Sequence, residues 1–125
     1  MTEIIDLSGK KILVVEDDDM NYVYLSQLFK LTSGEIKRVK SGKDALLSTA
    51  KMKYDVILMD IQLPDISGNE VTKRIRVTDK TTPIIAQTAS KTPDETDLSL
   101  EAGCTDVLIK PFSIDDLSSM LKKYI

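Results

Sequence analysis

The stretch ILVVEDDD, residues 12–19, places an unbroken apolar run directly before four consecutive carboxylates. Uninterrupted Ile, Leu and Val are typical of a strand that is buried on both faces of a parallel sheet. The four acids repel one another wherever they lie, so their crowding requires a compensating positive charge. The stretch therefore predicts a buried strand that ends at a charged site.

Four further runs of strand-forming residues follow, and longer amphipathic segments separate them. Together the runs predict five strands, at 11–15, 35–39, 55–59, 83–87 and 106–110. The remaining segments predict five helices, at 19–32, 42–52, 68–78, 93–102 and 114–124. The run EIKRV is the polar exception and suits an edge strand. This alternation predicts an α/β fold, a single-domain, doubly wound (βα)5 unit with a five-stranded parallel sheet.

Residues at the expected helix ends support these boundaries. Ser41 and Ser113 each stand three positions before an aspartate, which is a variant of the capping box at a helix start. Gly34 and Gly103 fit the positions at which helices stop.

The composition limits the chemistry that is open to the chain of 125 residues. A single cysteine excludes an internal disulfide and a Cys-based zinc site, and the absence of histidine removes the commonest general base. The net charge of -3 argues against nucleic acid as a direct partner. Because the sequence has neither an apolar run of about 18 residues nor the pattern of a signal peptide, we expect a cytoplasmic protein without membrane contact.

The predicted sheet locates the site, because ligands of open parallel sheets bind beyond the carboxyl ends of the strands. The first strand delivers Glu16 and Asp17 there, and the third delivers Asp60. The fourth delivers Thr88 and the fifth Lys110. If the first and third strands are neighbours, each close pair of acids costs about 3 kcal/mol at an effective dielectric of about 20. Oxygen ligands without His or Cys select Mg²⁺, or Mn²⁺, so we predict a divalent cation between these acids.

A hard cation beside an aspartate, a hydroxyl and an amine suits phosphoryl transfer. Asp60 is the candidate nucleophile, which would form an aspartyl phosphate. Lys110 and the metal would neutralise the phosphoryl oxygens, and the Thr88 hydroxyl would donate to one of them.

Four ordered motifs resemble the response-regulator receiver domain of two-component phosphorelay signalling. They are ILVVEDD (12–18), VILMDIQLPDISG (56–68), PIIAQTA (83–89) and IKPF (109–112). The resemblance covers roughly residues 11–124 and implies a flavodoxin-like fold. We therefore assign 11–125 to the receiver domain and 1–10 to an N-terminal lead-in.

The resemblance also implies a role for each candidate residue. Asp60 would be the phosphoacceptor, and Glu16 and Asp17 the acidic pair that holds Mg²⁺. Thr88 would be the switch hydroxyl and Lys110 the lysine that contacts the phosphate. Two further features follow from the resemblance: the backbone carbonyl of Gln62 as a metal ligand, and a cis peptide bond between Lys110 and Pro111.

Two positions depart from the usual pattern of the family. Val107 stands where receivers commonly carry a Tyr or Phe that moves together with the switch hydroxyl. The first acid is Glu16 rather than an aspartate, and we expect this longer side chain to reach the metal through water. Receiver modules of hybrid sensor histidine kinases are similar to this chain in two respects, the combination of Glu16 with Asn21 and the lead-in LSGKK.

The expected function is that of a phosphoacceptor signalling switch rather than a conventional enzyme. Because the chain has no histidine, a histidine kinase or a histidine phosphotransfer protein must supply the phosphoryl group. A downstream protein would read the phosphorylated surface, and dimerisation on phosphorylation is left open. No motif in the sequence identifies the cognate kinase, the stimulus, the output or the lifetime of the phosphoryl group.

Three alternatives to this reading have different signatures. A degenerate receiver would act as an interaction module without phosphorylation, and Val107 favours it slightly. A phosphatase of the haloacid dehalogenase type would carry an aspartate two residues past the nucleophile, where this chain has Gln62. A nucleotide or flavin site would need a glycine-rich phosphate loop after the first strand, and none is present there.

Overall fold

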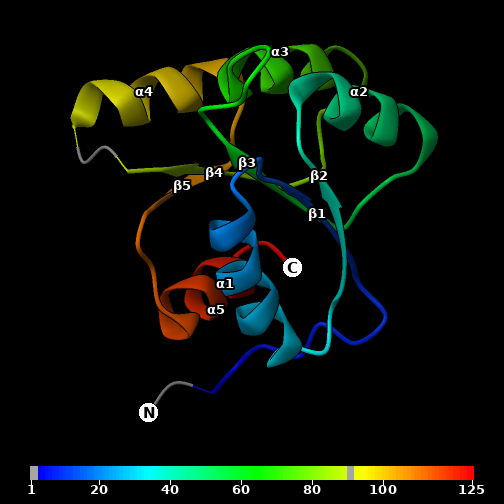
Figure 1. Cartoon of the computed structure of the whole chain (residues 1–125), viewed down its shortest axis with the longest axis vertical. Coiled ribbons are helices and arrows are strands. Elements are labelled where there is room, and N and C mark those ends of the chain that lie inside the picture. Colours follow the sequence, from blue (N-terminus) through cyan, green and yellow to red (C-terminus); the bar gives the residue numbers. More distant parts are fainter. Residues whose placement is uncertain (1–2, 90–91) are drawn as a thin grey trace.

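The computed structural model describes residues 3–89 and 92–125, in which five strands alternate with five helices (Figure 1). In chain order they are β1 (Lys11–Val15), α1 (Asp19–Lys30), β2 (Glu35–Val39), α2 (Gly42–Lys51), β3 (Val56–Asp60), α3 (Gly68–Thr78), β4 (Ile84–Thr88), α4 (Pro93–Ala102), β5 (Asp106–Ile109) and α5 (Ile114–Lys122). The alternation predicted from the apolar runs is confirmed.

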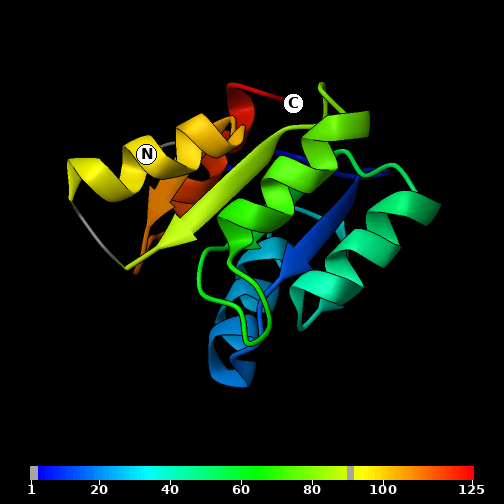
Figure 2. The ribbon, with the colours of Figure 1, turned by 90° about the horizontal axis from the view of Figure 1, so that it is seen from above.

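The strands form one parallel sheet in the order β2-β1-β3-β4-β5. Helices α1 and α5 cover one face, and α2, α3 and α4 cover the other (Figure 1 and Figure 2). This is the doubly wound, flavodoxin-like strand order. As predicted, the polar strand β2 lies at an edge. Strand β1 lies directly beside β3, which is the condition that the predicted acid cluster required.

Alternate side chains of the central strands enter two apolar cores. Val14, Leu58 and Ile85 pack with residues of α1 and α5 on one face of the sheet. Leu13 and Ile57 pack with residues of α2 and α3 on the other face. All five side chains are at most 1% exposed. Burial of each one stabilises the fold by about 1.5–3 kcal/mol, and this is why apolar residues dominate these strands.

Three strands differ by one residue from the predicted bounds, β3 and β4 at both ends and β5 at its carboxyl end. Strand β4 starts at Ile84 because Pro83 has no N–H group to donate to the sheet. Strand β3 extends through Asp60, since this residue is in register with Gln87 of β4. Strand β5 already ends at Ile109. Asp60 and Thr88 are therefore the last residues of their strands, which fixes their backbones in the sheet.

The helix ends follow the capping pattern with one exception. Ser113 forms a complete capping box at the start of α5, and the Ser41 hydroxyl accepts from the third residue of α2. Gly103 ends α4 in the left-handed conformation, at φ +113°. The predicted stop at Gly34 is wrong. Helix α1 ends earlier, and Ser33 adopts the left-handed conformation in its place, at φ +63°.

Part of the N-terminal lead-in packs against the domain. Leu7 is 1% exposed within the core beneath α1 and α5. The Ile5 amide donates to the Ser118 hydroxyl of α5 at 2.8 Å. The boundary between a lead-in at 1–10 and a receiver at 11–125 stays a prediction. Within the described ranges, the structure has no helix that is long and apolar enough to cross a membrane.

Candidate functional site

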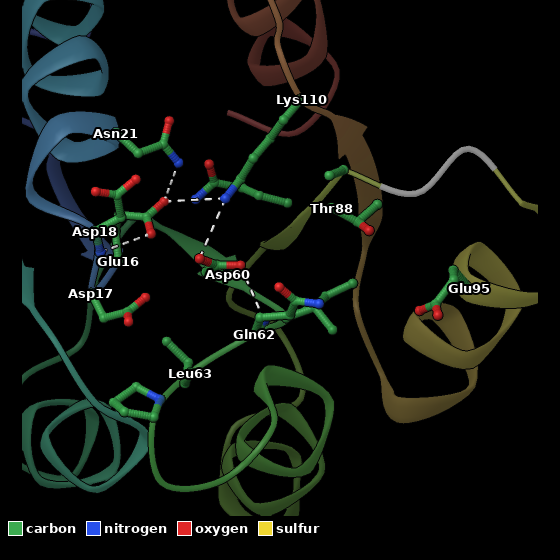
Figure 3. Close-up of a pocket in the computed structure, with 14 residues that line it drawn as sticks. Glu16, Asp17, Asp18, Asn21, Asp60, Gln62, Leu63, Thr88, Glu95 and Lys110 are labelled. Carbon is green, nitrogen blue, oxygen red and sulfur yellow. Dashed lines mark hydrogen bonds and ion pairs between the residues drawn. The ribbon is translucent and has the colours of Figure 1, made fainter.

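The carboxyl ends of β1 and β3 bring three acids together (Figure 3). Glu16 and Asp17 follow β1 directly, and Asp60 is the last residue of β3. Each can place a carboxylate oxygen within 4.8 Å of the other two. Glu16 and Asp60 are buried, and Asp17 is exposed. The predicted cluster of acids is therefore present, with two of its members held inside the protein.

Lys110, which directly follows β5, is the cation that faces these acids. Its Nζ atom lies 3.3 Å from Glu16 Oε1 and 3.3 Å from Asp60 Oδ2 (Figure 3). The peptide bond that joins it to Pro111 is cis, as the resemblance implied. A single ammonium group cannot balance three carboxylates when all of them are ionised, so the site favours a further positive charge.

Glu16 is held by groups from the start of α1. The Asn21 amide donates to Glu16 Oε1, and the Asp18 backbone N–H donates to Oε2 at 3.3 Å. Burial, and then the hydrogen bond and negative charge of Asp60, raise the pKa of Glu16 above its ordinary value. The acids therefore ionise together more readily when a cation is bound between them.

The loop after β3 folds back over Asp60. The Gln62 backbone N–H donates to Asp60 Oδ1 at 3.1 Å, and the Gly68 N–H donates to the Ile61 carbonyl at 2.7 Å. A Cβ atom on Gly68 would lie 2.1 Å from the Asp60 carbonyl oxygen. The absence of a side chain at Gly68 thus lets the loop close and places Gln62 at the pocket.

Thr88, at the end of β4, lines the same cavity as Lys110 and the acids. The cavity has a volume of about 670 Å³, and the side chains from β1, β3, β4 and β5 meet in it. The structure therefore brings together all six residues that the sequence singled out, namely Glu16, Asp17, Asp60, Gln62, Thr88 and Lys110. Their individual roles stay predictions.

Two neighbouring acids have structural roles. Asp18 caps α1, and its side chain accepts from the Met20 N–H. Asp19 forms ion pairs with Arg38 at 2.8 Å and with Lys40 at 3.1 Å. Of the four consecutive carboxylates, Glu16 and Asp17 therefore join Asp60 in the acidic cluster, and the side chains of Asp18 and Asp19 stabilise the start of a helix.

Sequence reasoning missed two residues of the site. The sequence pattern gives Asn21 no role beyond a likeness to hybrid kinases, but its amide is a direct partner of Glu16. Gln87 lines the cavity, and the sequence pattern marks it only as part of a motif. A polar residue within the apolar run PIIAQTA was the signal that could have found Gln87.

The donor set fits a magnesium ion. Carboxylates from two adjacent strands lie within the span of one small cation, and all the available donors are oxygens. The buried position of Glu16 and Asp60 keeps these oxygens in place before a cation arrives.

Comparison with known proteins gives one family. The sequence model of the response regulator receiver domain matches residues 12–122. The chain is 33% identical over 118 residues to the polar-differentiation response regulator DivK of Brucella anthropi, and the match covers 93% of this chain and 96% of DivK. It is 35% identical over 117 residues to Transcription factor SKN7 of Saccharomyces cerevisiae, covering 94% of this chain and 19% of that protein.

A solved structure agrees with the sequence matches. The receiver domain of the sensor histidine kinase PA1611 from Pseudomonas aeruginosa superimposes with a TM-score of 0.87 at 33% identity, and the match covers 94% of this chain and 98% of that one. That structure has a magnesium ion coordinated in the active site cleft. The fold, the acidic cluster and these matches together show that this chain belongs to the response regulator receiver domain family of two-component signalling.

Proposed function

We propose that the chain is a phosphoacceptor switch that receives a phosphoryl group on Asp60 from a phosphohistidine donor. A carboxylate oxygen of Asp60 attacks phosphorus, the phosphorus–nitrogen bond of the donor breaks, and the imidazole nitrogen keeps the bonding electrons. The product is an acyl phosphate. The observation that carries the proposal is the position of the buried Asp60 carboxylate between Lys110 and two further acids.

The neighbouring residues have distinct roles in this transfer. Glu16, Asp17, Asp60 and the Gln62 carbonyl would hold Mg²⁺, for which Mn²⁺ is a chemical substitute. When bound, the metal supplies positive charge against the incoming phosphoryl oxygens. Lys110 holds a second positive charge 3.3 Å from Asp60, and the Thr88 hydroxyl would donate to a phosphoryl oxygen.

The phosphohistidine that donates the phosphoryl group lies outside these 125 residues, because they include no histidine. We infer a histidine kinase or a histidine phosphotransfer protein as the donor, and hence a cytoplasmic location. The chain is similar both to the receiver domain of the sensor histidine kinase PA1611 and to the response regulator DivK, so a receiver of a hybrid kinase and a stand-alone regulator are both candidates. Both arrangements use the same site.

The output is a change in the surface around β4, α4, β5 and α5, read by a downstream protein or by a second copy of the chain. Val107 of β5 is half-buried and packs against the core beneath α2 and α3. Its side chain is smaller than the aromatic one that receivers commonly carry at this position. We therefore expect phosphorylation to change this surface less than it does in those receivers. This observation keeps the degenerate receiver, an interaction module without phosphorylation, as the second candidate.

Intact-protein mass spectrometry after incubation with acetyl phosphate and Mg²⁺ tests the proposal. We expect a single phosphoryl adduct that is labile to hydroxylamine, is absent with EDTA and is lost in Asp60→Asn. Asp18→Asn is the matched control, because it changes a neighbouring acid that caps α1, and asparagine caps equally well.

Retained metal-dependent labelling in Asp60→Asn would contradict the assignment of the phosphoacceptor. If the wild type forms no adduct and also fails to bind Mg²⁺, the degenerate receiver is favoured.

A further inference from the structure

Gln87 is a fully buried polar residue in the strand β4, whose sequence is IIAQT. Its exposed fraction is 0%. Neither the amide nitrogen nor the amide oxygen of its side chain has a hydrogen-bond partner among the described residues. Buried amides in folded proteins are nearly always paired, so this unpaired one indicates a partner from outside the chain.

The strand register places this amide beside the phosphoacceptor. Gln87 is the partner of Asp60 in the pairing of β4 with β3. Paired residues of neighbouring parallel strands point to the same face of the sheet, so the two side chains share a face. Gln87 also lines the cavity together with Glu16 and Lys110. Its unpaired amide therefore lies at the base of the proposed site.

The surroundings offer polar groups that a small molecule could connect. Lys110 Nζ has three N–H donors, and its contacts to Glu16 and Asp60 are both as long as 3.3 Å. A cavity of about 670 Å³ has room for water in addition to a cation. Water inside proteins binds at polar sites of this kind, where it satisfies groups that have no protein partner.

We propose that Gln87 is a positioning residue for Lys110. Its carboxamide binds a water molecule at the base of the cavity, and this water accepts the remaining N–H of Lys110. The ammonium group is thereby held over Asp60. The effect on phosphorylation rests on the proposed function above, whereas the effect on the position of Lys110 does not.

The test compares Gln87→Met with the wild type. Methionine has nearly the length of glutamine but no amide, so it removes the hydrogen bonds and keeps the packing. NMR of protein with isotope-labelled lysine reports the ε-methylene resonance of Lys110, assigned by its loss in Lys110→Arg. The rate of labelling by acetyl phosphate is measured on the same samples. Gln87→Leu repeats the comparison if the methionine variant does not fold.

Ser99→Ala is the matched control. Ser99 of α4 is also 0% exposed, and its hydroxyl is also unpaired among the described residues, but it does not line the cavity. Its replacement tests the loss of a buried polar atom away from the site.

We expect a shifted Lys110 resonance and labelling that is slower by about tenfold in Gln87→Met, and neither change in Ser99→Ala. An unmoved Lys110 resonance in Gln87→Met would overturn the proposal, whatever the labelling rate. If even the wild type is not labelled, the proposed phosphoacceptor function fails, and the lysine resonance still decides the role of Gln87.

Discussion

Gly68 has no side chain because the backbone of β3 occupies the space that one would need. A Cβ atom there would lie 2.1 Å from the Asp60 carbonyl oxygen, which belongs to a central strand and cannot move aside. The close approach also lets the Gly68 N–H bond the Ile61 carbonyl at 2.7 Å. One missing methyl group thus determines how the loop lies against the phosphoacceptor.

Gly68→Ala should therefore disturb both the fold and the site. We expect the free energy of unfolding to fall by about 1–3 kcal/mol, because the loop must move away from β3. We also expect weaker Mg²⁺ binding, since Gln62 lies in the displaced loop. Urea denaturation and Mg²⁺ titration measure the two effects.

Gly34→Ala is the control for this substitution. Its Cβ atom would meet the side chain of Ile12 at 2.7 Å, near the amino end of β2 and away from the acids. It should lose stability without losing Mg²⁺ affinity. Equal losses of Mg²⁺ affinity in the two variants would contradict the role given to Gly68.

Hydrogen bonds join the loop between β3 and α3 to the start of α2. The Asp65 carboxylate accepts from the Gly42 N–H at 2.8 Å and from the Lys43 N–H at 2.9 Å. These two N–H groups belong to the first turn of α2 and have no partner within the helix. They hold the pKa of Asp65 at about 2, below its ordinary value of 3.8. The loop that follows the phosphoacceptor is therefore anchored at its far side.

This anchor predicts a defined dependence of stability on pH. Because folding lowers the pKa of Asp65, its contribution is fully present above about pH 4 and is lost as the pH falls toward 2. Asp65→Asn should be less stable than the wild type at neutral pH, and the difference should shrink in this acidic range. Thermal unfolding at a series of pH values measures it.

Asp79→Asn is the control, because Asp79 has a similarly lowered pKa. Burial raises the pKa of Asp79, but hydrogen bonds from Thr82 and Thr81 help to lower it to about 2. Asp79 lies outside the loop, so its replacement should change the acid dependence but not Mg²⁺ affinity. An Asp65→Asn variant with the pH dependence of the wild type would contradict the anchor.

For the whole molecule, the site joins strands that are distant in sequence. Glu16 follows β1, Asp60 ends β3, and Lys110 follows β5. Lys110 and Glu16 are 94 positions apart in the chain. A cation held by the acids would therefore bind the folded chain and not the unfolded one, which couples metal binding to global stability.

Mg²⁺ should accordingly stabilise the protein against unfolding. At a concentration about 100-fold above its dissociation constant, it should add about 2.7 kcal/mol to the free energy of unfolding. Urea denaturation with Mg²⁺ and with EDTA measures the gain. Asp17→Asn should lose most of it, because one of the three carboxylates is neutralised. The same denaturation midpoint for the wild type in both buffers would contradict a metal site in the acidic cluster.

Local patterns explain why so much of the fold and the site could be predicted. The unbroken apolar run before Glu16 indicates a doubly covered strand, and parallel strands place their carboxyl ends at one edge of the sheet. The residues that end these strands or directly follow them therefore lie close to one another. Glu16, Asp60, Thr88 and Lys110 could be grouped for this reason, without knowledge of any side-chain conformation.

The sequence by itself determined the elements, their alternation and the residues at the strand ends, because strand and helix formation depends on neighbours a few positions apart. Only the tertiary structure decided which groups hold one another across the chain: Asn21 against Glu16, Asp65 against the start of α2, and the unpaired amide of Gln87 beside Asp60. The helix stop predicted at Gly34 failed for the same reason. Such contacts depend on register and packing between segments that are distant in sequence, and no local pattern encodes them.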